Sequence, residues 1–213
     1  MKKQVVAIDL DGTLIMGNTF RDYLSFCGKK ALACCRFDLY LAILWMVLLR
    51  KLRLVSHARM KRELLLETSV FFSQKGRLVK FVEEELQKLN PKVLAQIEAF
   101  RNQGFILALV TAAPVSYAQE MADRLCFDAC LATPLPSFLQ QEMWQENKAE
   151  NKVESLQQWL AAENLLLSSV ITDHTDDLPL AQAASESVFL YSSDKKNSMT
   201  FSKQISCQLI VIN

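Results

Sequence analysis

Acidic side chains gather in two short stretches of this chain, and each stretch follows a run of apolar residues. The first run, Val5-Val6-Ala7-Ile8, precedes Asp9 and Asp11, and the second, Val170-Ile171-Thr172, precedes Asp173, Asp176 and Asp177. Apolar runs of this length are typical of buried parallel strands, and open α/β sheets bind ligands at the carboxyl ends of their strands. Carboxylates so close together repel each other unless a cation or a shared proton relieves them. Both stretches therefore indicate a site that holds positive charge.

The carboxylate oxygens allow two kinds of chemistry, nucleophilic attack and metal binding. A carboxylate oxygen can attack phosphorus and form an aspartyl-phosphate. Oxygen ligands gathered on one side of a site suit Mg²⁺, which keeps several of its waters. His174 in the second stretch is more typical of a loop side chain than of a ligand, because Mg²⁺ prefers oxygen. Gly12 allows a sharp turn after the first acids, and Thr13 can hold that turn through a local hydrogen bond.

The first stretch resembles a motif of the haloacid dehalogenase (HAD) superfamily. Asp9-Leu10-Asp11-Gly12-Thr13-Leu14 matches its first motif, Asp-x-Asp-Gly-Thr-Leu/Val, and residues 172–180 resemble the fourth motif of the phosphoserine-phosphatase-like branch, subfamily IB. The resemblance covers nearly the whole chain. It implies an α/β fold, in which a Rossmann-like parallel sheet carries an inserted all-helical cap of the C1 type. It also implies a hydrolase that uses Mg²⁺.

The resemblance assigns roles to the acids. Asp9 would be the nucleophile, and Asp11 would protonate the leaving oxygen and later take a proton from water. Asp9, Asp11, Asp173 and Asp177 would form the metal site, with Asp11 contributing its backbone carbonyl. Asp177 would either bind the metal directly or support the site from behind.

Two further motifs would hold the phosphate. Thr111 follows the predicted strand 105–110 and matches the second motif, a Ser or Thr at a strand end. Lys152 opens a predicted helix and fits the third motif, a lysine that neutralises the nucleophile and the phosphate as a compact cation. Lys148 is the competing candidate for this lysine.

The predicted activity is hydrolysis of a small phosphorylated metabolite, a phosphomonoester, through an aspartyl-phosphate intermediate. HAD dehalogenases lack an acid at the position of Asp11, and P-type ATPases carry Thr there. Two alternatives stay open. One is a phosphotransferase that uses the same intermediate, and the other is a catalytically silent binding protein, against which the intact acids argue.

The predicted domains are a core of residues 1–19 and 103–213 and a cap of residues 20–102. Strands are expected near residues 4–10, 105–110, 128–133, 170–172, 188–191 and 209–212. The cap shows helical signals almost throughout, with a helix ended by Gly28 and a long apolar helix over 32–52. Residues 137–151 are expected to form a polar loop.

Three cap residues, Arg59, Lys61 and Arg62, are candidates for contact with an anionic part of the substrate. The alternative is that they form a solvated helix face. Phosphoserine phosphatases carry an acid nine places after the nucleophile to hold the substrate amine, and this chain has Asn18 there. Asn18 argues against phosphoserine itself.

The composition argues against nucleic-acid binding and against a zinc site. The net charge of +1 over 213 residues does not favour nucleic acid, and the six cysteines show no zinc-site spacing. Met1-Lys2-Lys3 leads directly into the first strand, so we expect a cytoplasmic protein with reduced thiols. The oligomeric state stays open.

The longest apolar run extends from Leu39 to Leu49. These eleven residues fall short of the ~20 that a spanning helix needs. The run therefore predicts a buried or interfacial helix. The basic flank 50–53 adds a second, less favoured possibility, contact with an anionic membrane surface.

Overall fold

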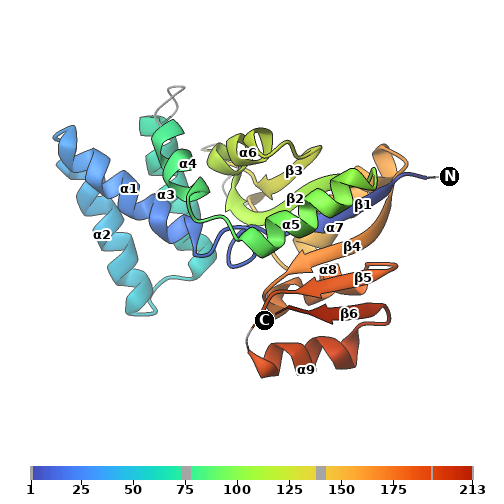
Figure 1. Cartoon of the computed structure of the whole chain (residues 1–213). Helices are drawn as coiled ribbons and strands as arrows, with labels where there is room; N and C mark the ends of the chain where they lie inside the picture. The colour runs from blue at the N-terminus through green and yellow to red at the C-terminus, as the bar shows by residue number, and fades with distance from the viewer. Residues whose placement is uncertain (1, 73–77, 138–142, 193, 213) are drawn as a thin grey trace.

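The computed structural model describes residues 2–72, 78–137, 143–192 and 194–212. Within these ranges six parallel strands form one sheet in the order β3-β2-β1-β4-β5-β6 (Figure 1). The strands are β1 (Gln4–Ile8), β2 (Ile106–Pro114), β3 (Ala129–Thr133), β4 (Leu166–Thr172), β5 (Ser187–Leu190) and β6 (Gln208–Val211). Each overlaps a predicted strand, but β2 continues beyond the predicted end at 110 and β4 begins before the predicted start at 170. The α/β fold class is confirmed. β1 lies centrally between β2 and β4, so its carboxyl end meets theirs.

Alternating side chains of β1 pack on opposite faces of the sheet, as the pleat requires. Val6 and Ile8 join a core on one face, and Val5 and Ala7 join a separate core on the other. The helices α5 (Pro91–Asn102) and α6 (Val115–Arg124) contribute to the first core, while α7 (Glu150–Ala162), α8 (Leu178–Gln182) and α9 (Lys195–Gln204) contribute to the second. Both faces of β1 are thus buried, which explains its unbroken apolar sequence.

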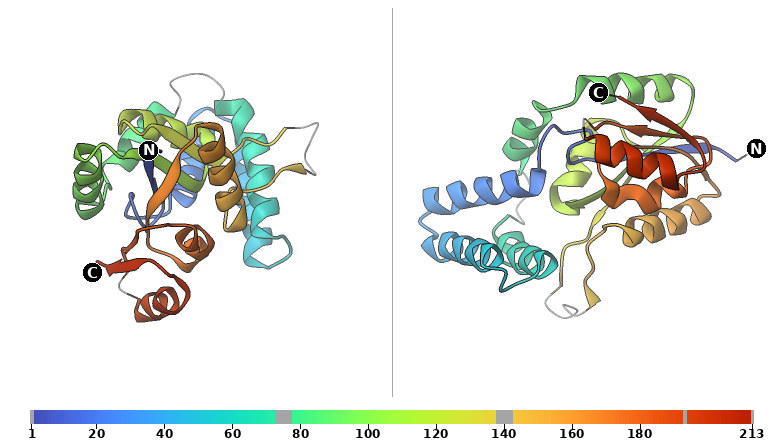
Figure 2. Two further views of the ribbon diagram at one scale, coloured as in Figure 1. Left: turned by 90° about the vertical axis from the view of Figure 1, so that its right-hand side faces the viewer. Right: turned by 90° about the horizontal axis from the view of Figure 1, so that it is seen from below.

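A group of helices lies beyond one end of the sheet (Figure 2). It contains α1 (Thr19–Ala33), α2 (Phe37–Lys51), α3 (His57–Phe72) and α4 (Val79–Leu86). Aromatic side chains join these helices to α6, since the Tyr23 ring packs against Phe81 and Tyr117. A buried hydroxyl pair adds to this contact, since Thr19 Oγ1 at the start of α1 lies 3.0 Å from the Tyr117 hydroxyl of α6. The predicted helical insertion therefore packs directly on the sheet domain.

The break between the first two helices differs from the prediction. Gly28 does not end α1, and no continuous helix covers 32–52. α1 runs to Ala33 and ends at Cys34, where the next residue, Cys35, takes a φ of 54°. Gly28 instead faces the ring of Tyr40 on α2. The prediction failed because a single glycine is tolerated inside a helix when tertiary packing stabilises it.

The domain boundaries at 19/20 and 102/103 stay a prediction. α5 lies along the sheet beside β2 in Figure 1, and the Phe100 ring contacts Phe105 and Phe189. We infer that α5 belongs with the core and that the cap ends near Asn90, which caps the N-terminus of α5. The polar segment predicted at 137–151 falls partly outside the described residues, and its last two residues, 150 and 151, begin α7.

Candidate active site

Two acids stand at neighbouring strand ends. Asp9 follows β1 and Asp173 follows β4, and the two strands pair in parallel up to Ile8 and Ile171. The backbone N–H of Asp9 donates to the Ile171 carbonyl at 3.0 Å, which extends the pairing to the acid itself. Asp9 is only 7% exposed. Its burial raises the pKa of the Asp9 carboxyl above its ordinary value, although the Lys152 charge opposes that rise.

Asp11 lies in the turn after Asp9 and faces the start of the cap. Its Oδ1 accepts a hydrogen bond of 2.6 Å from the backbone N–H of Thr19, the first residue of α1. Burial raises the pKa of Asp11 above its ordinary value, and the Thr19 bond opposes that shift. The carboxyl is thus held at the junction of core and cap with a raised affinity for a proton.

Gly12 allows this turn to approach Asp173 closely. Its φ of +79° lies in the left-handed region, and a Cβ placed on it would lie 2.2 Å from Asp173 Oδ2. Thr13 donates from Oγ1 to Asp173 Oδ1 at 3.1 Å, so the same turn also holds the acid in position. Any side chain at position 12 would displace the carboxylate at the end of β4.

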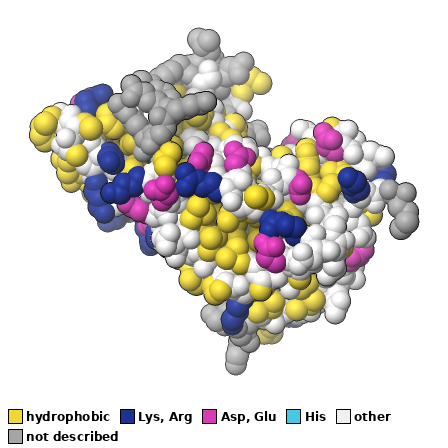
Figure 3. Space-filling model, turned by 45° about the horizontal axis from the view of Figure 1, so that its top comes forward, with side chains coloured by type: hydrophobic (Ala, Val, Ile, Leu, Met, Phe, Trp, Pro, Cys, Tyr) yellow, Lys and Arg dark blue, Asp and Glu magenta, His cyan; other side chains and the backbone are white. Residues whose placement is uncertain are grey.

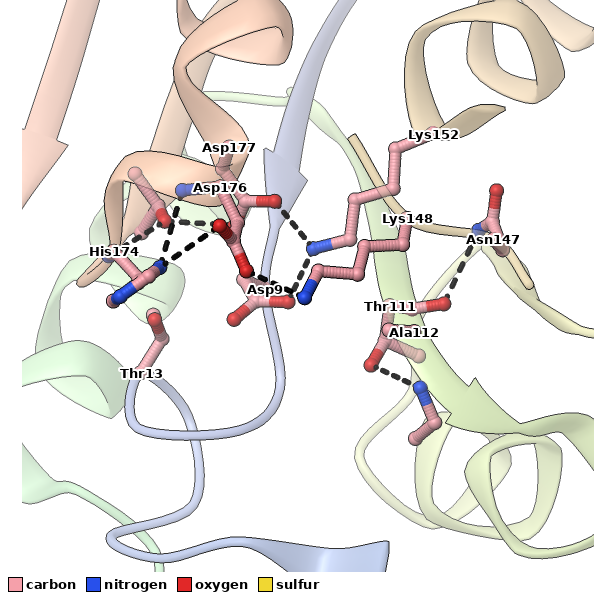
Figure 4. A network of polar contacts seen from close by, with 12 residues as sticks. Asp9, Thr13, Thr111, Ala112, Asn147, Lys148, Lys152, His174, Asp176 and Asp177 are labelled. Atoms are coloured by element: carbon pink, nitrogen blue, oxygen red, sulfur yellow. Dashed lines mark hydrogen bonds and ion pairs between the residues drawn. The ribbon is translucent and has the colours of Figure 1, made fainter. Parts of the chain in front are cut away.

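Lys152 lies between two acids at the base of the site (Figure 4). Its Nζ donates to Oδ1 of Asp9 and to Oδ1 of Asp177, each at 2.6 Å. Lys152 is 3% exposed, and burial alone would lower the pKa of its ammonium, but the two carboxylates raise it above its ordinary value. The second oxygen of Asp177 accepts from Thr172 Oγ1 at 2.8 Å. Each oxygen of Asp177 thus accepts a hydrogen bond, one from Lys152 and one from Thr172.

The competing lysine has a different partner. Lys148 Nζ pairs with Asp176 Oδ2 at 2.7 Å, and both side chains are about half exposed. Lys148 lines the cavity but forms no hydrogen bond with Asp9 among the described contacts. Of the two lysines, only Lys152 is buried against the candidate nucleophile.

Thr111 lies within β2, which continues to Pro114, and is 1% exposed. Its Oγ1 accepts from the backbone N–H of Ala113 at 3.0 Å. The backbone carbonyl of Thr111 accepts from Asn147 Nδ2 at 3.1 Å, and the same amide nitrogen also donates to the Leu131 carbonyl at 2.8 Å. Asn147 thus joins β2 to β3 beneath the site. Sequence reasoning missed it because it lies in a polar segment without periodicity.

A buried ion pair connects cap and core at the rim of the site. Lys61 of α3 pairs with Glu146, and its Nζ also donates to the Ala112 carbonyl at 2.7 Å. His57 Nδ1 lies 3.7 Å from the second Glu146 oxygen. Although burial favours the neutral acid, the His57 and Lys61 contacts lower the pKa of Glu146 to about 2. Sequence reasoning missed Glu146 and His57, which gave no signal of their own.

Of the three cap residues predicted to contact the substrate, one lines the cavity and two do not. Lys61 lines the cavity together with Asp9, Asp11 and Asp173. Arg59 is exposed, and Arg62 pairs with its neighbour Glu63 at 2.7 Å; neither lines the cavity. The cavity has a volume of about 390 Å³, which suits a small metabolite.

The donor set fits Mg²⁺ by its chemistry. Burial raises the pKa of Asp9, Asp11 and Asp173, which means that these carboxylates together lack sufficient counter-charge. Such hard oxygen donors are the ligands Mg²⁺ prefers. Within the described residues no group of three acidic, His or Cys side chains is arranged to hold a metal ion, so the side chains of Asp9 and Asp173 would need further oxygen ligands. Because Lys152 and Thr172 occupy Asp177, the geometry favours its supporting role over direct ligation.

Comparison with known proteins decides the family. The sequence profile of the haloacid dehalogenase-like hydrolases matches residues 6–182. The chain belongs to this family. The matched range extends from β1 to α8 and includes all the strand-end residues of the candidate active site. No curated protein matches the sequence of this HAD hydrolase.

Solved structures confirm the HAD fold. A Bordetella pertussis Tohama I protein of unknown function matches with a TM-score of 0.75 and 17% identity, over 99% of each chain. A phosphoserine phosphohydrolase-like protein from Francisella tularensis matches with a TM-score of 0.58 and 15% identity, over 100% of this chain and 95% of its own. A phosphoserine phosphatase solved as a phospho-aspartyl intermediate analogue matches with a TM-score of 0.56 and 14% identity, over 99% of this chain and 94% of its own.

Proposed function

We propose that this HAD hydrolase is a Mg²⁺-dependent phosphatase that cleaves a small phosphomonoester through an aspartyl-phosphate on Asp9. One observation carries the proposal: Lys152 is buried against Asp9, at the base of a cavity that Asp11 also lines. A carboxylate with a fixed ammonium beside it is arranged to receive a phosphate dianion. The match to phosphoserine phosphatases in fold supports the same reaction class.

In the first step an Asp9 carboxylate oxygen attacks phosphorus, and the bond between phosphorus and the leaving oxygen breaks. Asp11 supplies the proton that this oxygen needs to depart as an alcohol. The raised pKa of Asp11 suits this role, because burial favours the protonated form of the carboxyl. The Thr19 N–H holds the carboxyl in place during the transfer.

In the second step water attacks the phosphorus of the aspartyl-phosphate. Asp11, now a carboxylate, takes a proton from this water, and the acyl-phosphate bond breaks to release inorganic phosphate and restore Asp9. Lys152 and Thr111 hold the phosphoryl oxygens throughout, so most of the catalytic effect is positioning and electrostatic stabilisation.

Asp9 and Asp173, with the backbone of Asp11, would hold the Mg²⁺ ion. The ion supplies charge neutralisation for the phosphate and for the crowded carboxylates when it is bound. Asp177 would act on this site through Lys152, and Thr13 would act through Asp173.

The rest of the substrate would lie toward the cap, where Lys61 reaches the cavity. Asn18 also lines the cavity, but its side-chain oxygen already caps α1 by accepting from Arg21 N–H at 2.8 Å. The residue at this position therefore offers no carboxylate to a substrate ammonium. We infer a phosphomonoester other than phosphoserine.

The experiment is a phosphate-release assay with p-nitrophenyl phosphate and Mg²⁺. Asp9→Asn should abolish turnover, and Asp11→Asn should lower it by roughly 10²–10⁴-fold, the usual contribution of a general acid and base. Acid quenching of wild type should trap a phosphoenzyme that Asp9→Asn does not form. Full activity in Asp9→Asn would exclude the aspartyl-phosphate route. If an added alcohol is phosphorylated in place of phosphate release, the protein is a phosphotransferase.

A further inference from the structure

The outward face of α2 exposes a continuous stripe of large apolar side chains. Six of them are between 44% and 61% exposed: Phe37, Leu41, Leu44, Trp45, Leu48 and Leu52. Their spacing repeats with the period of an α-helix, so they share one face. On the opposite side Leu39 and Ile43 are buried, where α2 packs between α1 and α3 (Figure 2). Contiguous apolar surface of this kind marks an interaction site.

Basic side chains flank this stripe. Arg50, Lys51 and Arg53 are exposed at its carboxyl-terminal end, and within the described chain none of the three pairs with a carboxylate. Residues 29–54 contain six Lys and Arg but only one acid, Asp38, which Arg36 neutralises at 2.7 Å. The whole chain has a net charge of only +1. Positive charge is therefore concentrated in the segment that carries the apolar stripe. On the face of the molecule seen in Figure 3, by contrast, basic and acidic side chains are interspersed with hydrophobic ones.

We propose that the α2 face docks this protein onto the surface of a lipid bilayer that contains anionic lipids. The stripe would lie in the plane of the interface, where the 15 residues of α2 extend over roughly 22 Å. Trp45 suits the boundary between headgroups and acyl chains, and the basic end of the stripe would contact anionic headgroups. The contact is peripheral, because none of the described helices combines the length and the apolar content that crossing a membrane requires.

Charge also decides against a second copy of this chain as the occupant. A two-fold pair of α2 faces would bring two basic clusters together, and the only acid of segment 29–54, Asp38, is already paired with Arg36. An anionic bilayer offers both the apolar layer and the negative charge that this face lacks. The proposal does not depend on the proposed function, since no residue of α2 lines the catalytic cavity.

The experiment is sedimentation of the full chain with vesicles of phosphatidylcholine alone and of phosphatidylcholine mixed equally with phosphatidylglycerol. Wild type should sediment with the mixed vesicles and much less with the neutral ones. Leu41→Ser/Trp45→Ser should weaken binding by more than about 10-fold, because apolar area is lost. Reversing the three charges with Arg50→Glu/Lys51→Glu/Arg53→Glu should weaken it on the order of 100-fold, at roughly 5-fold per charge removed.

The matched control is Met199→Ser/Lys203→Glu on α9, where Met199 is 58% exposed and Lys203 is also exposed. It should bind vesicles as wild type does. Brominated lipids should quench the tryptophan fluorescence of wild type but not that of Trp45→Phe. Each variant should keep the melting temperature of wild type. Absence of binding to mixed vesicles, or equal binding by the control and the α2 variants, overturns the proposal. The proposal is also overturned if sedimentation equilibrium shows a dimer of the wild type that the α2 substitutions dissociate.

Discussion

Lys61 of the cap and Glu146 of the core form an ion pair whose side chains are only 3% and 10% exposed. The two residues are 85 positions apart in the sequence. Lys61 also reaches the Ala112 carbonyl on β2, one residue beyond Thr111. One cap lysine therefore connects α3, the segment before α7 and the strand that carries a candidate phosphate-binding residue. The cap is held over the cavity by buried charge as well as by apolar contact.

Breaking this pair should destabilise the protein strongly. Lys61→Met leaves the Glu146 carboxylate buried without its main partner, and removal of one member of a buried pair costs about 3–5 kcal/mol. Chemical denaturation should measure this loss, and the double variant Lys61→Met/Glu146→Gln should recover part of it. Arg59→Met on the same helix is the control, because Arg59 is exposed and should change stability by less than about 0.5 kcal/mol. Equal losses of stability in Lys61→Met and Arg59→Met would contradict a buried pair between Lys61 and Glu146.

The stability that Glu146 contributes should depend on pH in a defined window. The pKa of Glu146 falls from its ordinary 4.5 to about 2 in the folded protein, so the folded state favours the charged form. This contribution is fully present above about pH 4.5 and is lost as the pH falls toward 2. The difference in unfolding free energy between wild type and Glu146→Gln should therefore be constant above that window and shrink within it. A difference that grows on acidification would refute the assignment.

Lys152 should be essential for turnover, whereas Lys148 should not. Lys152→Met removes the cation that bonds both Asp9 and Asp177, so we expect a loss of kcat/KM of roughly 10³-fold or more. Lys148→Met removes only a half-exposed pair with Asp176 and should cost less than about 10-fold. Steady-state kinetics with p-nitrophenyl phosphate compare the two. If Lys148→Met proves the more damaging, the phosphate-binding lysine has been assigned wrongly.

Two glycines with the same backbone conformation should respond differently to alanine. Gly12 and Gly104 have φ values of +79° and +81°, but only at Gly12 would a Cβ meet another group, Asp173 Oδ2 at 2.2 Å. Gly104→Ala should lose about 1 kcal/mol of stability through backbone strain and keep its activity. Gly12→Ala should lose activity as well, because Asp173 must move. Denaturation and turnover measured on both variants test this, and an active Gly12→Ala would show that the Asp173 position is not required.

Chelation should abolish activity and magnesium should restore it. Asp9, Asp11 and Asp173 lack sufficient counter-charge, so an ion bound among them should also stabilise the folded state. We expect Mg²⁺ to raise the melting temperature of wild type and to have much less effect on Asp173→Asn. Melting curves in EDTA and in Mg²⁺ provide this readout without reference to turnover. Undiminished activity in excess chelator would exclude the metal-dependent mechanism.

The sequence alone determined the strands and the acids at their ends. Val5–Ile8 of β1 and Val170-Ile171 at the end of β4 are apolar and are followed by Asp9 and Asp173. These local patterns predict strands because both faces of β1 and β4 are buried. The order of the motifs placed the helical insertion between β1 and β2. It also indicated Asp11 and Thr111 as candidate site residues, since a parallel sheet brings consecutive strand ends to one edge.

Tertiary structure decided which polar residues meet. The sequence favoured Lys152 by its position but left Lys148 as a competitor, whereas in the structure only Lys152 is buried against Asp9, a partner 143 positions away. Glu146 and Asn147 gave no signal, because residues in an irregular polar segment follow no period that reveals their partners. The sequence allowed α2 to be buried or interfacial, and only the packing of α1 and α3 around one side left its apolar stripe exposed. Local periodicity encodes elements, whereas contacts between distant side chains depend on how those elements pack.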